Sequence, residues 1–427
     1  MNYINADIAY KNVINYSRTI LHSDLNNFYA SVECMLNPAL KDKYVAVCGS
    51  PEDRHGIVLA KNQKAKMCGV KTGETIWQAQ AKCPELICVP PNFDQYLKYS
   101  EIIHSIYLRY TNLVEPFGMD ECWLDVTKSR LLFGSGEEIA NRIRNDVKKE
   151  TGLTVSVGVS FNKIFAKLGS DIKKPDAVTV IPYENFKNIV WKLPACELLG
   201  VGRATLKKLS QSSIYTIGDL ALTPLKFLKE KFGKNGETLW LYANGLECSP
   251  VNDFGFDIQE KSISNGITLV CDLTEQNQVW NVIYKLCESV SHRLRERRLY
   301  ASSVGITLKS PRLECEDFQA PLDFETQSMR ELAKKAYCLF EKNYDFSKNV
   351  RAISVRAFNL TSKKSPRQTC MFLSEEIIKK QEKAENILDT LQQKYGTKAI
   401  CYASLTGELN MPKNSDKKII LPSPLKR

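Results

Sequence analysis

Three carboxylates stand where the chain leaves an expected strand or turns between two strands. Asp24 ends the segment TILHSDL, and Asp120 and Glu121 are adjacent in the segment GMDECWLD. Acids gathered at one sheet edge repel one another unless cations offset their charge. In phosphoryl transfer, one divalent ion activates the attacking hydroxyl and a second steadies the leaving oxygen. These acids predict a site for two Mg²⁺ ions, whose oxygen shells also need backbone ligands such as the Leu25 carbonyl.

The adjacency of Asp120 and Glu121 limits how the two can act together. Neighbouring residues of a regular strand point to opposite faces of a sheet, so both can face one site only if the hairpin turn relaxes this alternation. Taken alone, an Asp-Glu pair is better explained as an ordinary polar turn. The metal site therefore depends on a fold that brings Asp24 beside the hairpin.

The order of the expected elements supplies such a fold. A strand at 19–25 leads into a helix with Phe28, Val32 and Met35 on one face. After an insertion with two short strands and two small helices, the chain resumes with a helix, a hairpin, a helix, a strand, a helix and a closing strand. Without the insertion this is the ferredoxin-like βαββαβ order, which places the first and third strands side by side.

The remaining chain predicts an α+β protein of several domains. Residues 182–248 favour a small helical domain with a Gly-x-Gly turn, and the following residues repeat a βαββαβ-like order. A Lys/Ser/Pro-rich linker, an amphipathic helix and a basic tail complete the chain. At about 150 residues per domain, a chain of 427 residues predicts three or four domains.

Bulk composition excludes some classes of protein. The chain is 43% hydrophobic and 25% charged, without an apolar run long enough for a membrane span or a secretory signal, so we expect a cytoplasmic protein with no membrane partner. Its 14 cysteines form no C-x-x-C pair and predict reduced thiols, while four scattered histidines leave little for zinc. A net charge of +11 favours a polyanionic partner without identifying it.

At this point the sequence resembles a known family. HSDLNNFYASVE and GMDECWLD are similar to the two catalytic motifs of the Y-family DNA polymerases, particularly the DinB, or polymerase IV, branch. The resemblance extends from about Thr19 to Thr361 and includes SFNKIFAKLGSDIKKP. It implies a right-hand polymerase with a ferredoxin-like palm, small fingers, a helix-hairpin-helix thumb and a little finger with a four-stranded sheet and two helices. The implied bounds are 1–34 and 92–182 for the palm, 35–91 for the fingers, 183–250 for the thumb, 251–361 for the little finger and 362–427 for the linker, clamp-binding peptide and tail.

The resemblance implies a role for each active-site position. Asp24 and Asp120 would bind both ions, Glu121 the catalytic ion, and the Leu25 carbonyl the nucleotide-side ion. Tyr29 would be the steric gate that leaves no room for a ribose 2′-hydroxyl. The implied nucleotide-binding residues are Asn27, Phe28, Tyr29, Gln63, Lys66 and Lys174.

Two features of this sequence depart from the family pattern near the nucleotide. Gln63 and Lys66 stand where tyrosine and arginine are usual, so a forked guanidinium is lost from the phosphate site. Asn26 replaces an aspartate that is common after the first catalytic acid.

DNA and clamp contacts are also implied. Gly200, Gly202 and Arg203 lie in a turn whose amides can face a phosphate, and Arg295 and Arg298 lie in an arginine-rich run of the implied little finger. A solvated helix face is the alternative for the arginines. Gln368, Met371 and Phe372 resemble the short peptide that binds the bacterial sliding clamp, although Thr369 stands where leucine is common. The alternative for this segment is a helix start that caps the next helix.

The function implied is low-fidelity, template-directed addition of deoxynucleoside triphosphates to a primer 3′ end, in translesion synthesis and DNA repair. We expect a monomer that binds primer-template DNA. A catalytically silent scaffold for damage tolerance is the main alternative, and the retained Asp24, Asp120 and Glu121 argue against it. A nucleotide cyclase could use a similar palm, but it would have no use for the helix-hairpin-helix and little-finger regions.

Overall fold

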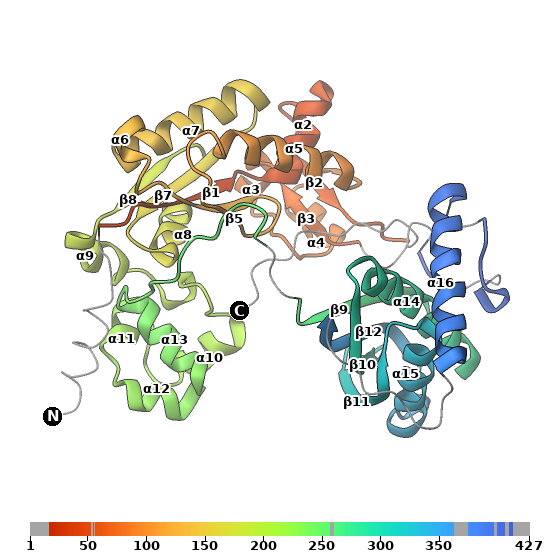
Figure 1. Ribbon diagram of the computed structural model, residues 1–427. Coiled ribbons are helices and arrows are strands. Elements are labelled where there is room, and N and C mark those ends of the chain that lie inside the picture. Colours follow the sequence, from red (N-terminus) through yellow and green to blue (C-terminus); the bar gives the residue numbers. More distant parts are fainter. Residues whose placement is uncertain are drawn as a thin grey trace. The chain divides into compact units, whose positions relative to one another are not determined.

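The computed structural model describes residues 17–52, 54, 56–256, 260–362, 375–396, 399–405 and 410–412. These residues fall into two compact units, one with the described residues of 17–48 and 58–256 and the other with those of 49–57 and 260–412 (Figure 1). Gln368, Met371 and Phe372 of the predicted clamp-binding peptide lie outside the described residues. Each unit has a sheet and a hydrophobic core of its own.

A five-stranded sheet carries the predicted carboxylates. Its order is β5-β6-β1-β7-β8, with β1 antiparallel to both neighbours and β8 added parallel to β7. The first strand thus lies beside the second strand of the hairpin, as the ferredoxin-like order predicted. The strands are β1 (Ile20–Leu25), β5 (Val114–Pro116), β6 (Glu121–Asp125), β7 (Val155–Ser160) and β8 (Val178–Ile181).

Helices cover both faces of this sheet, which is why all six residues of β1 are buried. Helix α8 packs on β1, β7 and β8, whereas α7 packs on β1 and β7 from the other face and contacts α5 (Figure 1). Gly158 permits the approach of α8, because a Cβ there would stand 1.9 Å from the Ala166 carbonyl oxygen. The helices are α2 (Phe28–Leu36), α5 (Phe93–Tyr107), α6 (Arg130–Phe133), α7 (Gly136–Thr151) and α8 (Lys163–Ile172).

The insertion after α2 forms a small three-stranded sheet, ordered β3-β2-β4, with two helices. The sequence predicted two strands and missed β4, a three-residue strand that exists because it pairs in parallel with β2. The elements are a 3₁₀ turn at Pro38–Leu40, β2 (Val45–Cys48), β3 (Val58–Lys61), α3 (Gln63–Met67), α4 (Ile76–Lys82) and β4 (Ile87–Val89).

The segment after β8 is helical, as predicted. Gly200 has φ +97°, a left-handed conformation that favours glycine, in the turn before α10. The apolar side chains of this helical segment share a core with Phe165 and Leu168 of α8. The segment therefore packs against the helix that covers one face of the five-stranded sheet. The elements are 3₁₀ turns at Tyr183–Asn185 and Ala195–Glu197, and α9 (Phe186–Val190), α10 (Arg203–Ser210), α11 (Ile217–Leu222), α12 (Leu225–Phe232) and α13 (Lys234–Ala243).

The second unit contains a four-stranded antiparallel sheet ordered β11-β10-β12-β9, packed against two helices. The expected element order left β11 without a named segment. This strand lies at the sheet edge and carries charges and a proline, so it lacks the apolar pattern of a central strand. The elements are β9 (Ser262–Leu273), α14 (Gln276–Glu296), β10 (Leu299–Lys309), β11 (Cys315–Thr326), α15 (Met329–Asn343), a 3₁₀ turn at Phe346–Lys348 and β12 (Val350–Ser362).

A further helix, α16 (Glu375–Tyr395), belongs to this second unit, followed by a 3₁₀ turn at Ala403–Leu405. It is the amphipathic helix that the sequence predicted, and its acids pair with side chains of α14. Within the described residues, no helix combines the length and apolarity that a membrane crossing requires.

Candidate active site

The three predicted acids meet at one end of the first sheet. Asp24 lies directly opposite Glu121 in the register of β1 and β6, and the Leu25 amide donates to the Asp120 carbonyl oxygen at 2.9 Å. Strand β6 begins at Glu121, so Asp120 belongs to the bend that precedes it. Gly118, with φ +109°, lies in the same bend. The bend therefore frees Asp120 from strict strand alternation, as the sequence required.

Strand alternation explains which side chains share the site. Leu21 and Leu25 enter the core on one face of β1, while the alternate residues His22 and Asp24 face α8. On β6, Glu121 is on that second face too, because it contacts Lys167 of α8. The acids consequently lie along the end of α8 and the turn that follows it.

Two lysines hold two of the acids. Lys174 Nζ lies 2.8 Å from Asp24 Oδ2 and 2.8 Å from Asp171 Oδ1. Lys167 pairs with Glu121, whose Oε2 also lies 3.3 Å from His22 Nε2. These ammonium groups offset part of the negative charge that the acids concentrate here.

Burial, the neighbouring acids and the nearby cations shift the pKa values of the three acids. Burial, together with the charges of Asp24 and Glu121, raises the pKa of Asp120 to about 6. Burial also raises the pKa of Asp24, against the opposing charge of Lys174. For Glu121, burial is outweighed by His22 and Lys167, which lower its pKa to about 2. Asp120 is thus the acid whose ionisation most needs an added cation.

The donor set fits a hard divalent cation, because carboxylate oxygens are the ligands that Mg²⁺ prefers. In the described part of the chain, no three His, Cys, Asp or Glu side chains have the spacing of metal ligands as they stand. Asp24 and Glu121 are instead engaged by Lys174 and Lys167. An ion would therefore replace ammonium contacts at these oxygens.

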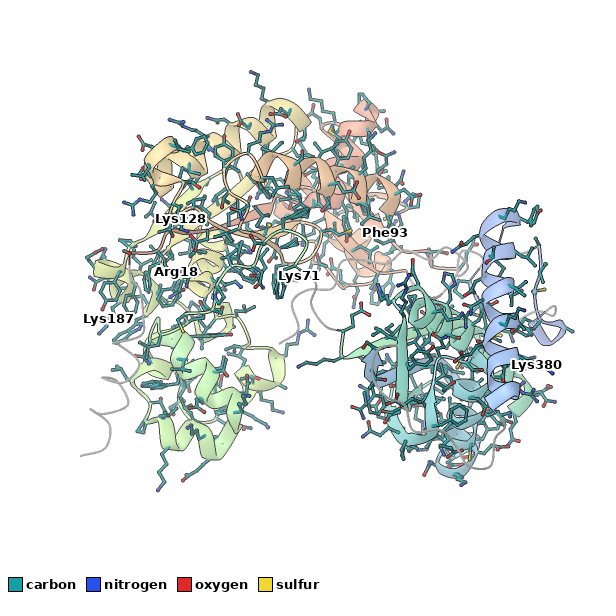
Figure 2. The ribbon with its side chains drawn as sticks, in the orientation of Figure 1. Arg18, Lys71, Phe93, Lys128, Lys187 and Lys380 are labelled. Atoms are coloured by element: carbon teal, nitrogen blue, oxygen red, sulfur yellow. The ribbon has the colours of Figure 1, made fainter. Side chains whose placement is uncertain are left out.

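Tyr29, in the first turn of α2, packs against aromatic side chains of α5. Its ring stacks on Tyr96 of α5, with centroids 4.3 Å apart and planes 10° from parallel, and Phe93 meets it edge-on. Phe93 begins α5 and is labelled in Figure 2. Burial, together with the charge of Asp120, raises the pKa of Tyr29 to about 12. Phe28, by contrast, is a core residue only 3% exposed.

Family models match most of the chain. The impB/mucB/samB family matches residues 23–171, its C-terminal domain matches 260–371, and a DNA polymerase-iota thumb domain matches 196–247. DNA polymerase IV of Acetivibrio thermocellus is 51% identical over 89% of this chain and 95% of its own. DNA polymerase IV 1 of Bacillus subtilis is 37% identical over 90% of this chain and 92% of its own. The chain belongs to the DinB-like branch of the Y-family DNA polymerases.

Solved structures of Y-family polymerases have the same fold. A Y-family DNA polymerase chimera matches with a TM-score of 0.71 at 24% identity, covering 81% of this chain and all of its own. DinB from Sulfolobus solfataricus matches with a TM-score of 0.54 and the same identity and coverage. This Y-family member is a DNA-directed DNA polymerase of the translesion class, with palm, fingers, thumb and little finger. The domain bounds given above stay a prediction.

The fingers of this Y-family polymerase present Gln63 and Lys66 to solvent from α3. Asn62 caps this helix, because its Oδ1 accepts from the Ala65 amide at 3.0 Å. Burial and the charge of Lys66 lower the pKa of Lys61, so two ammonium groups lie near each other at this edge. In the described structure, neither Gln63 nor Lys66 is paired with a palm acid.

The thumb turn has the form expected for a phosphate contact. Gly202 is the N-cap residue of α10, and a Cβ there would meet nothing within 4 Å. Arg203 follows it and is exposed. The first amides of α10 therefore lie beside an exposed guanidinium, an arrangement that can accept an anion.

Arg295, for which a phosphate contact was predicted, pairs with acids of the same unit in this structure. Its side chain is 6% exposed, and its guanidinium pairs with Glu385 and Asp389 of α16, each at 2.6 Å. The guanidinium is therefore engaged by two carboxylates, and its contact with DNA stays a prediction. Arg298, at the end of the same run, is exposed.

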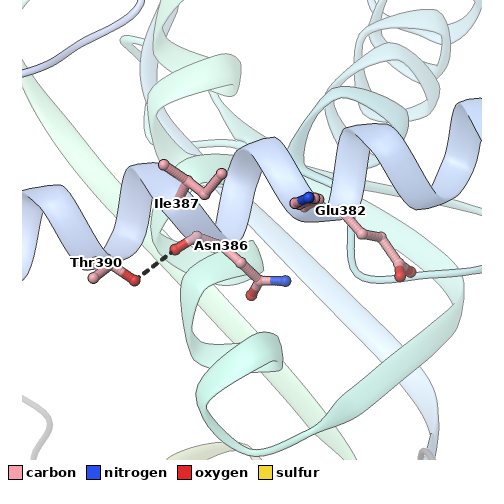
Figure 3. A pocket seen from close by; sticks show the side chains of 5 residues that line it. Glu382, Asn386, Ile387 and Thr390 are labelled. Carbon is pink, nitrogen blue, oxygen red and sulfur yellow. Dashed lines mark hydrogen bonds between the residues drawn. The ribbon is translucent and has the colours of Figure 1, made fainter.

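A surface hollow lies on α16, lined by Glu382, Asn386, Ile387 and Thr390 among others (Figure 3). It belongs to the second unit, whereas the three acids belong to the first.

His22, Lys167 and Lys61 were missed by the sequence reasoning. His22 is two residues before Asp24 on a strand, and period-2 alternation predicts that both face the same side. Lys167 has no comparable local signal, because its contact with Glu121 depends on how α8 crosses the sheet.

Proposed function

We propose that this Y-family polymerase joins deoxynucleotides to a primer 3′ end with two Mg²⁺ ions held by Asp24, Asp120 and Glu121 and by the Leu25 carbonyl. When bound, such ions lower the pKa of the primer hydroxyl and stabilise the leaving pyrophosphate. The observation that carries the proposal is the convergence of three acids on one sheet edge, with the pKa of Asp120 raised to about 6.

Lys174 is the chain's own cation for the incoming triphosphate. Its ammonium is already held at Asp24 Oδ2, so a phosphate arriving beside this acid meets a fixed positive charge. Lys167 pairs with Glu121 in the same way and supplies a second positive charge beside the acids. Both lysines can turn from carboxylate to phosphate without a change of backbone, because an ammonium on a flexible stem is a point charge without directional demands.

The other nucleotide contacts follow from position. Tyr29 is supported from behind by Tyr96, so its ring cannot retreat from a ribose 2′-hydroxyl. Phe28 is buried, so it and Asn27 would contact the triphosphate through backbone amides at the start of α2. Gln63 and Lys66 of α3 would reach the phosphates from the fingers.

DNA contacts are proposed at exposed donors. The Gly200–Gly202 turn and Arg203 would hold the duplex backbone without reading its bases, and Arg298 would do the same from the little finger. Gln368, Met371 and Phe372 remain a proposed sliding-clamp peptide. We propose further that the chain works as a monomer in the cytoplasm, in lesion bypass and repair.

Primer extension with single deoxynucleotides or ribonucleotides, with and without Mg²⁺, tests the proposal on the parent and on Asp120→Ala. We expect template-matched, Mg²⁺-dependent addition that Asp120→Ala abolishes while DNA binding persists. Glu150→Gln is the matched control, because Glu150 is a partly exposed acid paired with Arg109 on the palm surface. Full activity of Asp120→Ala would refute the metal assignment, and an inactive but DNA-binding parent would favour the scaffold.

A further inference from the structure

A buried asparagine at the end of β1 binds the turn that follows Lys174. Asn26 is 5% exposed, and its Oδ1 accepts from the Asp176 amide at 2.8 Å and from Thr154 Oγ1 at 3.1 Å. Its Nδ2 donates to Ser156 Oγ at 2.9 Å. Every polar atom of the side chain is therefore used, and one bond leaves the sheet for the Lys174 turn.

Helix α7 holds the same turn from another direction. Arg144 Nη1 donates to the Asp176 carbonyl oxygen at 2.7 Å, and Lys148 Nζ lies 2.8 Å from Asp176 Oδ2. Asp176 has φ +54°, in the left-handed region, so its conformation depends on such contacts. The backbone of Asp176 is thus fixed through its amide by Asn26 and through its carbonyl by Arg144.

This turn determines where the Lys174 ammonium can be. Lys174 is two residues from Asp176, and its Nζ is held between Asp24 and Asp171. A lysine side chain is flexible, so the point from which it starts decides which anions it reaches at low entropic cost. A shift of the turn would move the ammonium relative to Asp24 without altering either residue.

We propose that Asn26 is a positioning residue for Lys174, and that through the Asp176 amide it sets the affinity of the site for the nucleoside triphosphate. The proposal rests on the proposed function, in which Lys174 meets the triphosphate. It assigns Asn26 no contact with metal or substrate.

The side-chain amide of Asn26 carries no charge, which affects the electrostatics of the nearby acids. Ser156, which accepts from Asn26, lies opposite Asp24 in the register of β1 and β7. An aspartate at position 26 could still accept from the Asp176 amide, but it would add a negative charge beside the acids. An amide therefore holds the turn without adding to their repulsion.

A double-mutant cycle on the full chain separates positioning from simple packing. The variants are Asn26→Leu, Lys174→Met and their combination, and the readouts are KM for the deoxynucleotide, kcat, and Tm. We expect Asn26→Leu to raise KM about tenfold with a smaller change in kcat, since it removes a hydrogen bond to the turn. In the Lys174→Met background the same change should leave KM unaltered.

Asn244→Leu is the matched control. Asn244 is a half-buried asparagine of the thumb whose Nδ2 donates to the carbonyl oxygens of Ala221 and Trp240 at 3.2 and 3.0 Å. We expect it to lower Tm, with an effect on KM that is the same in both Lys174 backgrounds. Equal, additive effects of Asn26→Leu in both backgrounds would overturn the positioning role while leaving the polymerase assignment intact.

Asn26→Asp keeps the test decisive if Asn26→Leu does not fold. Because a carboxylate retains the acceptor for the Asp176 amide, we expect KM to stay within about threefold of the parent. A rise in KM as large as that of Lys174→Met would overturn the proposal. An unchanged KM in Lys174→Met would also overturn it, together with the role of Lys174, whereas the outcome for Asp120→Ala would still decide the metal site.

Discussion

The acids at the palm edge and the acids of α16 are both buried beside cations, but their surroundings differ. We call Asp24, Asp120 and Glu121 the palm cluster, and Glu385 and Asp389 the α16 cluster. In the α16 cluster, Asp389 is paired with Arg295 and with His292 at 3.0 Å, and these bonds outweigh burial and lower its pKa to about 2.

Glu385 completes the contrast. Burial, with a smaller effect of the Asp389 charge, raises its pKa, but its oxygens accept from Ser328 Oγ at 2.9 Å and from the Met329 amide at 3.3 Å, and Arg295 pairs with it. The α16 cluster is thus closed by its own partners. In the palm cluster, the charges of Asp24 and Glu121 add to burial in raising the pKa of Asp120, which leaves a demand for cations. In the α16 cluster, protein side chains and amides neutralise the acids, and the cluster holds a helix in place. In the palm cluster, uncompensated negative charge is left, and the cluster can bind cations.

The largest difference should appear when one acid of the palm cluster is neutralised. We expect Asp120→Asn to reduce extension by about a thousandfold or more, because an ion ligand is lost. The same change should raise Tm, since it removes a buried charge from beside two others. Single-turnover extension and calorimetry measure the two effects. A lower Tm would mean that the charge of Asp120 is already compensated by protein groups, and the contrast between the palm and α16 clusters would be wrong.

Breaking the α16 cluster should have the opposite pattern. Arg295→Met leaves Glu385 and Asp389 without their guanidinium, and such a loss costs about 3 kcal/mol or more in stability. We expect a lower unfolding temperature of the little finger with kcat on short primers unchanged. Lys335→Met is the control, because its partner Asp323 is 77% exposed. Retained stability in Arg295→Met would show that α16 is held by other contacts.

Unlike the α16 cluster, the palm has a proposed steric gate, Tyr29, whose ring contacts Phe93 and Tyr96. Tyr29→Ala should lower discrimination against ribonucleotides by about a hundredfold, because the ring that excludes the 2′-hydroxyl is gone. Tyr99→Ala on the same helix as Tyr96 is a control, since Tyr99 packs at the edge of the palm core. The ratio of kcat/KM for the two sugars is the measurement, and an unchanged ratio would remove Tyr29 from the gate.

The smallest expected effect is on the salt dependence of DNA binding, and it should differ between Arg295 and the two exposed arginines, Arg203 and Arg298. Arg203→Gln and Arg298→Gln should each reduce the salt dependence of DNA binding by about one unit in the slope of log K against log[salt], as expected for one lost phosphate contact. Arg295→Gln should leave the slope unchanged, because its guanidinium belongs to the α16 cluster. A reduced slope for Arg295→Gln would restore its predicted contact with DNA.

Local patterns were sufficient for most of the fold. The helix predicted after the hairpin is α7, whose Ser135 and Glu138 form a capping box and whose Gly152 ends it in a left-handed conformation. These signals lie within four residues of the helix end they define. Strand β4 was missed because three residues carry too little pattern, and it depends on a partner some forty residues away in β2.

The candidate site divides in the same way. Asp24, Asp120 and Glu121 were predicted from their types in short segments and from an element order that brought the first strand beside the hairpin, whereas the role of Tyr29 was implied by the resemblance. Lys167 was missed and the pairing of Arg295 with α16 was not predicted, because the partner of a long cationic side chain depends on which distant helix covers it.

The sequence by itself determined most of the elements, the pairing of the first palm strand with the hairpin and the acids that they carry, because strand and helix periods and turn residues act over a few positions. The tertiary structure decided which cations face those acids, that Asp120 escapes strand alternation in a bend, and that Asn26 reaches the Asp176 amide across 150 residues of chain. Charge balance in a buried cluster is a sum over residues from different elements, and no local pattern contains that sum.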